Sequence, residues 1–199
     1  MKQKFIRAVL LATLIILLIL TNMPFTEKSE TKIFTLPGLP RPIANTPVII
    51  TSAGQSTDTY IIRDISNQLM IRSFFMPQAR DVDLKDIKTI VFVVGYSSLG
   101  AKLQSISYEE EKIRIEKLLQ KAKEDKLTVL TVVIGGEQLH DNKTEELLRL
   151  IGKQTDYLIG MRESSRASIL TELAKDGDIP LTLVNKVNDI SEPFASAFR

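Results

Sequence analysis

The chain has 199 residues, of which 44% are hydrophobic and 25% charged, and its formal net charge is +2. This is the composition of an ordinary globular protein, and the nearly balanced charge lacks the basic excess typical of a nucleic-acid-binding domain. The absence of cysteine and the single histidine, His140, exclude disulfides, thiol nucleophiles, cysteine zinc sites and multi-histidine metal sites. We therefore predict no cofactor, no metal centre and no nucleic-acid partner, although ligation of a cation by oxygen atoms alone stays open.

The first 25 residues have the pattern of a membrane-directed segment. Lys2, Lys4 and Arg7 precede the apolar run AVLLATLIILLIL, residues 8–20. That run has the length of the apolar part of a signal peptide, whereas a helix over residues 5–25 would span about 31 Å, close to the hydrocarbon thickness of a bilayer. Because no small-x-small cleavage pattern follows, we expect a membrane anchor with the rest of the chain outside the cytoplasm. Secretion after cleavage is the alternative.

Residues 26–46 are expected to tether the anchor to a folded domain over residues 47–199. The segment carries charge first and then the proline-rich stretch LPGLPRPIANTP. Prolines at this spacing prevent a helix and favour extended chain. The alternative is a segment that packs along the surface of the domain.

From Pro47 onward, short apolar runs alternate with amphipathic stretches. Strands are predicted over 47–51, 89–95, 127–136, 156–161 and 179–187, and helices over 59–70, 107–125, 142–154 and 164–177. Ser107 and Glu110 have the spacing of a capping box, and Gly177 is a candidate for the residue that ends its helix. Segment 71–86 is long for a connection, which indicates either an extra short strand at 71–75 or a loop over a site.

This alternation predicts an α/β fold, a doubly wound sandwich of Rossmann or flavodoxin type, in which helices cover both faces of a five-stranded parallel sheet. We favour the strand order 2-1-3-4-5, with the N-terminal membrane helix preceding the sandwich. Ligands of such folds bind outside the carboxyl ends of the strands. Five loops are therefore candidates for a binding site: 51–58, 95–102, 135–142, 161–166 and 185–189.

The first candidate loop is TSAGQSTD, residues 51–58. Gly54 permits a close approach of the backbone, while Ser52, Gln55 and Ser56 offer hydroxyl and amide groups. Free amides at the start of the following helix would suit an anion. The alternative is a plain turn in which Ser56 caps the helix and Gly54 supplies the bend.

The second loop, GYSSLGAK, approaches two known motifs without matching either. A phosphate-binding loop needs lysine directly after its last glycine, but Ala101 separates Gly100 from Lys102. A nucleophile elbow needs glycine two residues after its serine, where this chain has Leu99. The alternative is a glycine-rich turn, in which the serine hydroxyls bond the local backbone. The candidate ligand-binding residues here are Gly95, Ser97 and Ser98.

The remaining loops add a glycine and several charged residues. Gly136 follows the third predicted strand and would let a ligand come close, and Glu137 and His140 are candidates for proton transfer. Arg162, Arg166, Lys102 and Lys186 could together present positive charge to a carboxylate or phosphate, although each taken singly is an ordinary solvated residue.

The stretches PVIITSAGQS, TIVFVVGYSSLGAK, VVIGGE, DYLIGM and IPLTLVNKV together resemble a bacterial family of exported or membrane-anchored α/β proteins that is described as a domain of unknown function. The resemblance covers about residues 47–187 and depends mainly on the ITSAGQS and VVG-x-S-S…LGA loops. It implies the α/β fold and its topology. It implies no particular activity.

The function expected from these observations is the binding of a small anionic molecule at the strand ends by a membrane-tethered extracytoplasmic domain. The predicted site consists of Ser52, Gly54, Gln55, Ser56, Gly95, Ser97, Ser98 and Gly136. One alternative is a hydrolase or transferase that uses Ser97, Glu137 or His140 in the same loops. The other is a protein-interaction module at the membrane. The sequence identifies no protein partner and leaves enzymatic activity undecided.

Overall fold

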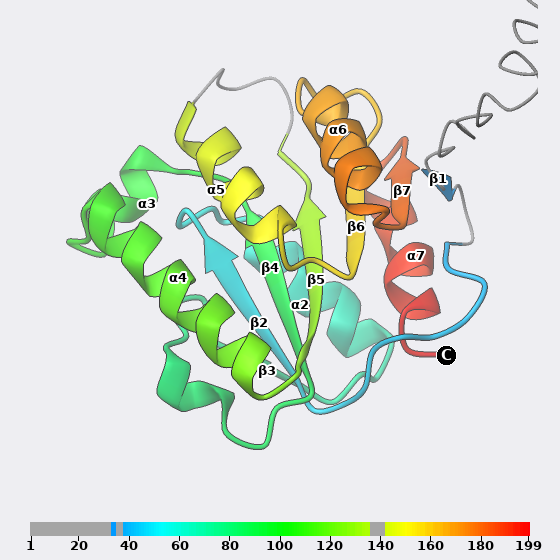
Figure 1. The fold of residues 1–199 in the computed structure, drawn as a ribbon, viewed down its shortest axis with the longest axis horizontal. Coiled ribbons are helices and arrows are strands. Elements are labelled where there is room, and N and C mark those ends of the chain that lie inside the picture. Colours follow the sequence, from blue (N-terminus) through cyan, green and yellow to red (C-terminus); the bar gives the residue numbers. More distant parts are fainter. Residues whose placement is uncertain (1–32, 35–37, 136–141) are drawn as a thin grey trace, which may run out of the picture.

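The computed structural model describes residues 33–34, 38–135 and 142–199. Within these ranges, parallel strands form one sheet in the order β1-β7-β6-β5-β4-β2-β3 (Figure 1). The strands are β1 Ile33–Phe34, β2 Val48–Ala53, β3 Ser73–Phe75, β4 Thr89–Val94, β5 Thr128–Val133, β6 Tyr157–Met161 and β7 Leu181–Val184.

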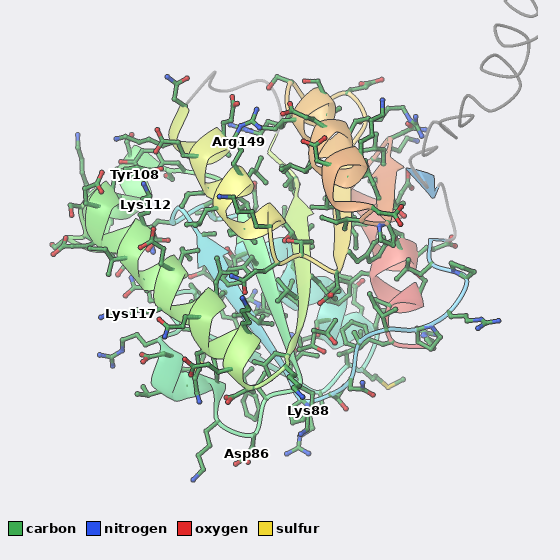
Figure 2. The ribbon with its side chains drawn as sticks, viewed as in Figure 1. Asp86, Lys88, Tyr108, Lys112, Lys117 and Arg149 are labelled. Carbon is green, nitrogen blue, oxygen red and sulfur yellow. The ribbon has the colours of Figure 1, made fainter. Side chains whose placement is uncertain are left out.

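Helices lie on both faces of this sheet. The helices are α2 Thr59–Gln68, α3 Ser98–Leu103, α4 Tyr108–Glu124, α5 Asn142–Gly152, α6 Ala167–Gly177 and α7 Ser191–Ser196, with 3₁₀ turns at Asp81–Leu84 and Val187–Ile190. Helices α4, α5 and α6 pack on one face, and α2 and α7 pack on the other. On the outer side of the first face, Arg149 of α5 forms ion pairs with Glu145 and with Glu172 of α6 (Figure 2).

Strand β4 shows why the strands read as continuous apolar runs. Ile90, Phe92 and Val94 pack toward α4, α5 and α6, whereas Val91 and Val93 pack toward α2 and α7. All five side chains are almost completely buried. A strand covered on both faces needs apolar residues at every position, so the α/β fold with a parallel sheet that the sequence predicted is confirmed.

The predicted strand number and order need correction. The sequence predicted five strands in the order 2-1-3-4-5, but the part of the domain from Val48 onward has six described strands in the order 2-1-3-4-5-6. The short strand β3 is the second of these six in chain order, and it lies at the edge of the sheet beside β2. The predicted strand 89–95 is third in chain order and pairs with the other side of β2. β3 was foreseen only as one alternative, because three residues are too few to show a period of two. A further strand, β1, pairs with β7 at the opposite edge.

Local sequence signals had mixed outcomes. The capping box at the start of α4 is confirmed, since Ser107 Oγ accepts from Glu110 N at 3.2 Å and Glu110 Oε2 accepts from Ser107 N at 2.8 Å. The prediction for Gly177 is wrong, because Gly177 is still helical and Asp178 takes the left-handed conformation with φ +48°. The short helices α3 and α7 were not predicted.

The proline-rich segment is described from Gly38 onward. Leu39 and Ala44 are buried against α7, and the amides of Ile43 and Ala44 both donate to Ala197 O. The predicted membrane segment, residues 1–25, lies outside the described residues. Within the ranges that the structure describes, no helix has the length and apolar character needed to cross a bilayer.

Candidate functional site

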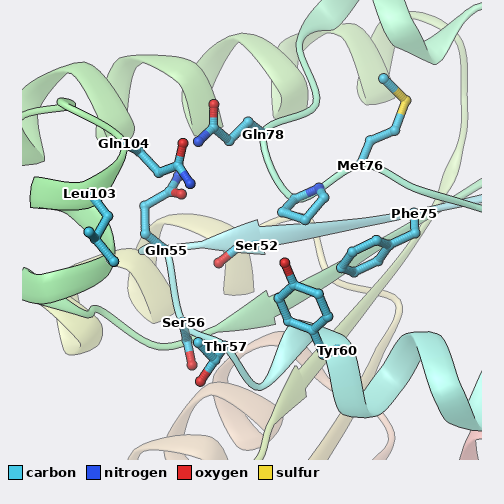
Figure 3. A pocket seen from close by; sticks show the side chains of 12 residues that line it. Ser52, Gln55, Ser56, Thr57, Tyr60, Phe75, Met76, Gln78, Leu103 and Gln104 are labelled. Atoms are coloured by element: carbon cyan, nitrogen blue, oxygen red, sulfur yellow. The ribbon is translucent and has the colours of Figure 1, made fainter.

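A cavity of about 600 Å³ opens beside the carboxyl ends of β2 and β3. Its walls come from four parts of the chain: the end of β2 with the turn that follows it, the first turn of α2, the end of β3 with the segment after it, and helix α3 with its C-cap residue. Figure 3 shows the side chains that line the cavity. They belong to Ser52, Gln55, Ser56, Thr57, Tyr60, Phe75, Met76, Pro77, Gln78, Gly100, Leu103 and Gln104.

The lining combines apolar walls with uncharged polar groups. Tyr60, Phe75, Met76 and Leu103 supply apolar surface, and serine, threonine and glutamine residues supply hydroxyls and amides. Among the described residues that line the cavity, none carries a charge at neutral pH. Mostly apolar walls with a few polar groups, enclosing a volume of this size, are the usual properties of a small-molecule site.

Ser52 stands out at the floor of this cavity. Its side chain is 1% exposed, and its hydroxyl oxygen is buried without a hydrogen-bond partner among the described residues. The backbone N–H of the same residue is satisfied, since it donates to Pro77 O at 3.1 Å. A buried hydroxyl in a folded protein nearly always has a partner, and the partner of the Ser52 hydroxyl does not come from the described residues.

A buried acidic residue of α4 forms hydrogen bonds with the turn after β2. Glu111 of α4 is 1% exposed and accepts hydrogen bonds from Gly54 N at 2.8 Å and from Gln55 Nε2 at 2.9 Å. Because a carboxylate can only accept, the amide nitrogen of Gln55 must face Glu111, and the amide oxygen is directed elsewhere. The orientation of a residue that lines the cavity is therefore fixed by α4.

Arg114 completes this network and neutralises the buried charge. Its guanidinium bonds both carboxylate oxygens of Glu111, through Nη2 at 2.8 Å and Nε at 2.9 Å. It also donates to Ser52 O at 2.6 Å and to Ala79 O at 2.7 Å. The same side chain thus joins β2 to the segment that follows β3, and both segments contribute residues to the wall of the cavity.

Two glycines allow the loops around the cavity to approach closely. Gly54 has φ +105°, and a Cβ there would lie 2.6 Å from Gly95 O. A Cβ at Gly100 would lie 2.2 Å from Gln55 O. Gln55 and Tyr96 also form an isolated bridge between the turn after β2 and the turn after β4. The two turns consequently pack against each other, and the cavity lies on the β3 side of β2.

The structure brings together only some of the predicted site residues. Ser52, Gln55 and Ser56 line the cavity, and Gly54 lies behind them in the turn. Gly95 packs against Ser56, where a Cβ would lie 3.1 Å from the serine Cβ.

The remaining predicted residues lie elsewhere. Ser97 is the N-cap of α3 and accepts from Gly100 N at 3.0 Å, while Ser98 is the exposed first residue of that helix. Gly136, Glu137 and His140 lie outside the described residues. Ser56 was also considered as the cap of α2, but the N-cap is Asp58, whose N–H donates to Ser56 Oγ at 3.1 Å.

Sequence reasoning missed most of the cavity wall. Tyr60, Phe75, Gln78, Leu103 and Gln104 were not predicted as site residues. The unusual length of the 71–86 connection was the available signal for Phe75 and Gln78. No comparable signal existed for α3, whose sequence SLGAKL is too short to show helical periodicity.

The positive residues suggested for an anion do not gather at the cavity. Arg162 donates to Asn185 Oδ1 at 3.1 Å and to Leu183 O at 3.2 Å, and Arg166 donates to Gly135 O at 3.4 Å. Lys102 lies on α3, and Lys186 precedes the second 3₁₀ turn. None of these four residues lines the cavity.

Comparison with protein families gives the affiliation of the chain. The family model described as the domain of unknown function DUF6305 matches residues 45–198. The chain belongs to the DUF6305 family. This confirms the resemblance noted in the sequence, and the matched residues contain β2 through β7 and every residue that lines the cavity of this DUF6305 domain. No curated protein and no solved structure was found to match.

Proposed function

We propose that this DUF6305 protein is a small-molecule-binding domain, held outside the cytoplasm by its N-terminal segment, and that its ligand enters the cavity beside β2 and β3. The observation that carries the proposal is the buried hydroxyl of Ser52, which has no partner among the described residues and lines an otherwise largely apolar cavity. A buried polar group without a partner costs about 1–3 kcal/mol. A ligand that bonds Ser52 would remove that cost.

The character of the lining supports an uncharged ligand over the anion expected from the sequence. No charged side chain of the described residues lines the cavity. The amides at the start of α2 are partly used as well, because Asp58 N donates to Ser56 Oγ and Tyr60 N donates to Thr57 O. An anion would therefore be desolvated in the cavity without a cation to compensate it.

The catalytic alternative has less support. Ser97, the candidate nucleophile, caps α3 and accepts a hydrogen bond from Gly100 N. No carboxylate or imidazole of the described residues bonds Ser97, although a nucleophilic serine requires a base within hydrogen-bond reach. The remaining candidates for that base, Glu137 and His140, are outside the described residues.

One observation favours the alternative of a protein-interaction module. Leu103 and Leu99 of α3 are 74% and 67% exposed, and Met76 on the other side of the cavity is 37% exposed. Exposed apolar side chains gathered in one region can form a contact surface for a protein partner. The two candidate functions differ in whether a small molecule alone stabilises the domain.

The test is thermal unfolding of the full-length protein against a library of neutral metabolites, carboxylates, phosphates and nucleotides. A ligand present at 100 times its Kd should add about 2.7 kcal/mol of stability. Leu103→Trp, which places a larger side chain at the cavity, should abolish the shift. Lys102→Trp is the matched control on the same helix, and it should preserve the shift because Lys102 does not line the cavity. If no member of the library stabilises the protein, the small-molecule proposal fails and the interaction module becomes the favoured function.

A further inference from the structure

We propose that the uncharged ligand of this cavity is a sugar, whose hydroxyls bond Ser52 and the glutamines around the cavity while one face of its ring lies on Tyr60. This inference rests on the proposed function and specifies its ligand. Its support comes from the polar groups of the cavity, its aromatic wall and the absence of charge from its described lining.

Several polar side chains of the lining are available to a ligand. Besides the hydroxyl of Ser52, these are the hydroxyls of Thr57 and Tyr60 and the amides of Gln78 and Gln104. None of the five forms a side-chain hydrogen bond with another described residue. Hydroxyl groups donate and accept, and a glutamine amide offers two donors and one acceptor oxygen. A sugar presents several hydroxyls, each of which is also donor and acceptor.

These polar groups are spread over different sides of the cavity. Figure 3 shows the Tyr60 hydroxyl turned toward Ser52, while the amides of Gln78 and Gln104 lie on the side of Gln55. The groups come from β2, α2, the segment after β3 and the end of α3. A ligand that satisfies them all needs hydrogen-bonding groups distributed around its periphery, as a sugar ring has.

The apolar wall of the cavity suits a second property of a sugar. One face of a sugar ring presents C–H groups, which pack against aromatic side chains. Tyr60 is 48% exposed, so part of this residue is open to a ligand. The ring is held in place, because its centroid lies 4.9 Å from that of Phe75 and the Arg63 guanidinium lies 4.9 Å from the Tyr60 centroid. A rigid aromatic ring with a polar tip provides apolar contact and hydrogen bonding to one ligand at little entropic cost.

Other ligand classes match the cavity less well. A nucleotide or a carboxylic acid would require a positive group, and no positive side chain of the described residues lines the cavity. The guanidinium of Arg63, beside Tyr60, already pairs with Asp64. A purely apolar molecule would offer no hydrogen-bonding group to the Ser52 hydroxyl or to the glutamine amides of the lining. A free nucleobase could stack on Tyr60 but carries its polar atoms in one plane, whereas the cavity presents them from four segments of the chain.

The test is calorimetric titration of the full-length protein, in a detergent without a sugar headgroup, with glucose, N-acetylglucosamine and soluble cello- and chito-oligosaccharides. Adenosine and N-acetylleucine amide serve as neutral ligands that are not sugars. We expect saturable binding of at least one sugar. Binding of oligosaccharides alone would indicate a polymeric glycan as the source, and binding of monosaccharides a free sugar, and both results support the inference.

Three variants locate the binding. Ser52→Ala should weaken sugar binding by about tenfold, because the ligand loses a buried hydrogen bond, and Tyr60→Ala should reduce it below detection. Ser66→Ala is the matched control, since Ser66 is buried and bonds Ser73 Oγ outside the cavity, and it should leave the Kd unchanged within about twofold. Sugar binding that is insensitive to both cavity variants overturns the inference.

The controls separate this inference from the proposed function. If adenosine or the amide binds with the same dependence on Ser52 and no sugar binds, the sugar assignment is wrong and the small-molecule function stands. If neither these compounds nor any member of the wider library binds, both proposals fail together.

Discussion

The carboxylate of Glu111 in helix α4 accepts a hydrogen bond from the backbone N–H of Gly54, 57 positions earlier in the chain, at 2.8 Å. This bond connects the helix on one face of the sheet to the turn that follows β2. Arg114, one helical turn later, is 10% exposed at its side chain and pairs with the same carboxylate. The shape of the turn therefore depends on a buried ion pair that lies outside the turn.

We expect Glu111→Gln to destabilise the domain by about 3–5 kcal/mol, because it leaves the buried Arg114 without its counter-charge. The new amide would also direct N–H donors at Gln55 or Arg114, which are donors themselves. Chemical denaturation measures the effect. Glu109→Gln, the same change at an exposed position of the same helix, should cost less than about 0.5 kcal/mol. Equal losses in the two variants would show that the pair has no structural importance.

Gly54→Ala should reduce the free energy of unfolding by about 2–5 kcal/mol, the sum of backbone strain and overpacking. The strain arises because φ is +105°, and the overpacking arises because the new Cβ would lie 2.6 Å from Gly95 O. Gly135→Ala is the control, since its φ is not in the left-handed region and its Cβ would meet Asp58 Oδ2 at 3.4 Å. If the two variants lower the denaturant midpoint by the same amount, the close packing of the two turns is contradicted.

Ser52→Ala should make the unliganded domain more stable than the wild type, by up to about 1–3 kcal/mol, because it removes a buried hydroxyl that has no partner among the described residues. Ser66→Ala should cost about 1 kcal/mol, because the Ser66 hydroxyl bonds Ser73 Oγ at 2.8 Å. Thermal unfolding of both variants without ligand makes the comparison. A loss at Ser52 as large as that at Ser66 would mean that the Ser52 hydroxyl already has a partner in the free protein.

Alkaline pH should destabilise the domain through Tyr157 of β6. Burial raises the pKa of this phenol from 10.0 to about 12, although a hydrogen bond with Thr182 acts in the opposite direction. Because the folded state holds the proton more tightly than the unfolded state, this contribution to stability is complete below pH 10 and disappears as the pH rises toward 12.

Two measurements check the behaviour of Tyr157. Absorbance titration of the folded protein should show one of the four tyrosines ionising at higher pH than the others. In Tyr157→Phe that late step should be missing, and the fall in stability between pH 10 and 12 should be smaller than in the wild type. A late step that persists in the variant would assign the raised pKa to a different tyrosine.

The framework of the fold could be predicted because its signals repeat along the chain. β4 is apolar at successive positions, and α4 combines a capping box with a helical period, so each pattern admits one interpretation. β3 gives no such signal, since its three residues SFF fit a strand or a loop equally well. The strand that decides the order of the sheet was therefore the one the sequence could not establish.

The candidate site was predictable only in its central turn. Ser52, Gln55 and Ser56 were found because the carboxyl end of the first strand is a general ligand position. Glu111 looks the same as its neighbours Glu109 and Glu110, yet it precedes Ile115 by four residues and so lies on the buried face of α4. This helical spacing was a usable signal that Glu111 is buried. No signal in the sequence identified the partner of Glu111 in the turn after β2, because that contact depends on how two distant segments pack.

The sheet order also sets how far the cavity lies from the strand nearest the N-terminal segment. β1, at residues 33–34, and β3, beside the cavity, lie at opposite edges, six strand spacings or about 29 Å apart. If the apolar segment before β1 is held in a bilayer as proposed, the chain approaches the domain from the edge farthest from the cavity. The opening of the cavity would then contact the solution beyond the lipid headgroups. A molecule dissolved in water would therefore reach it more readily than one dissolved in the membrane.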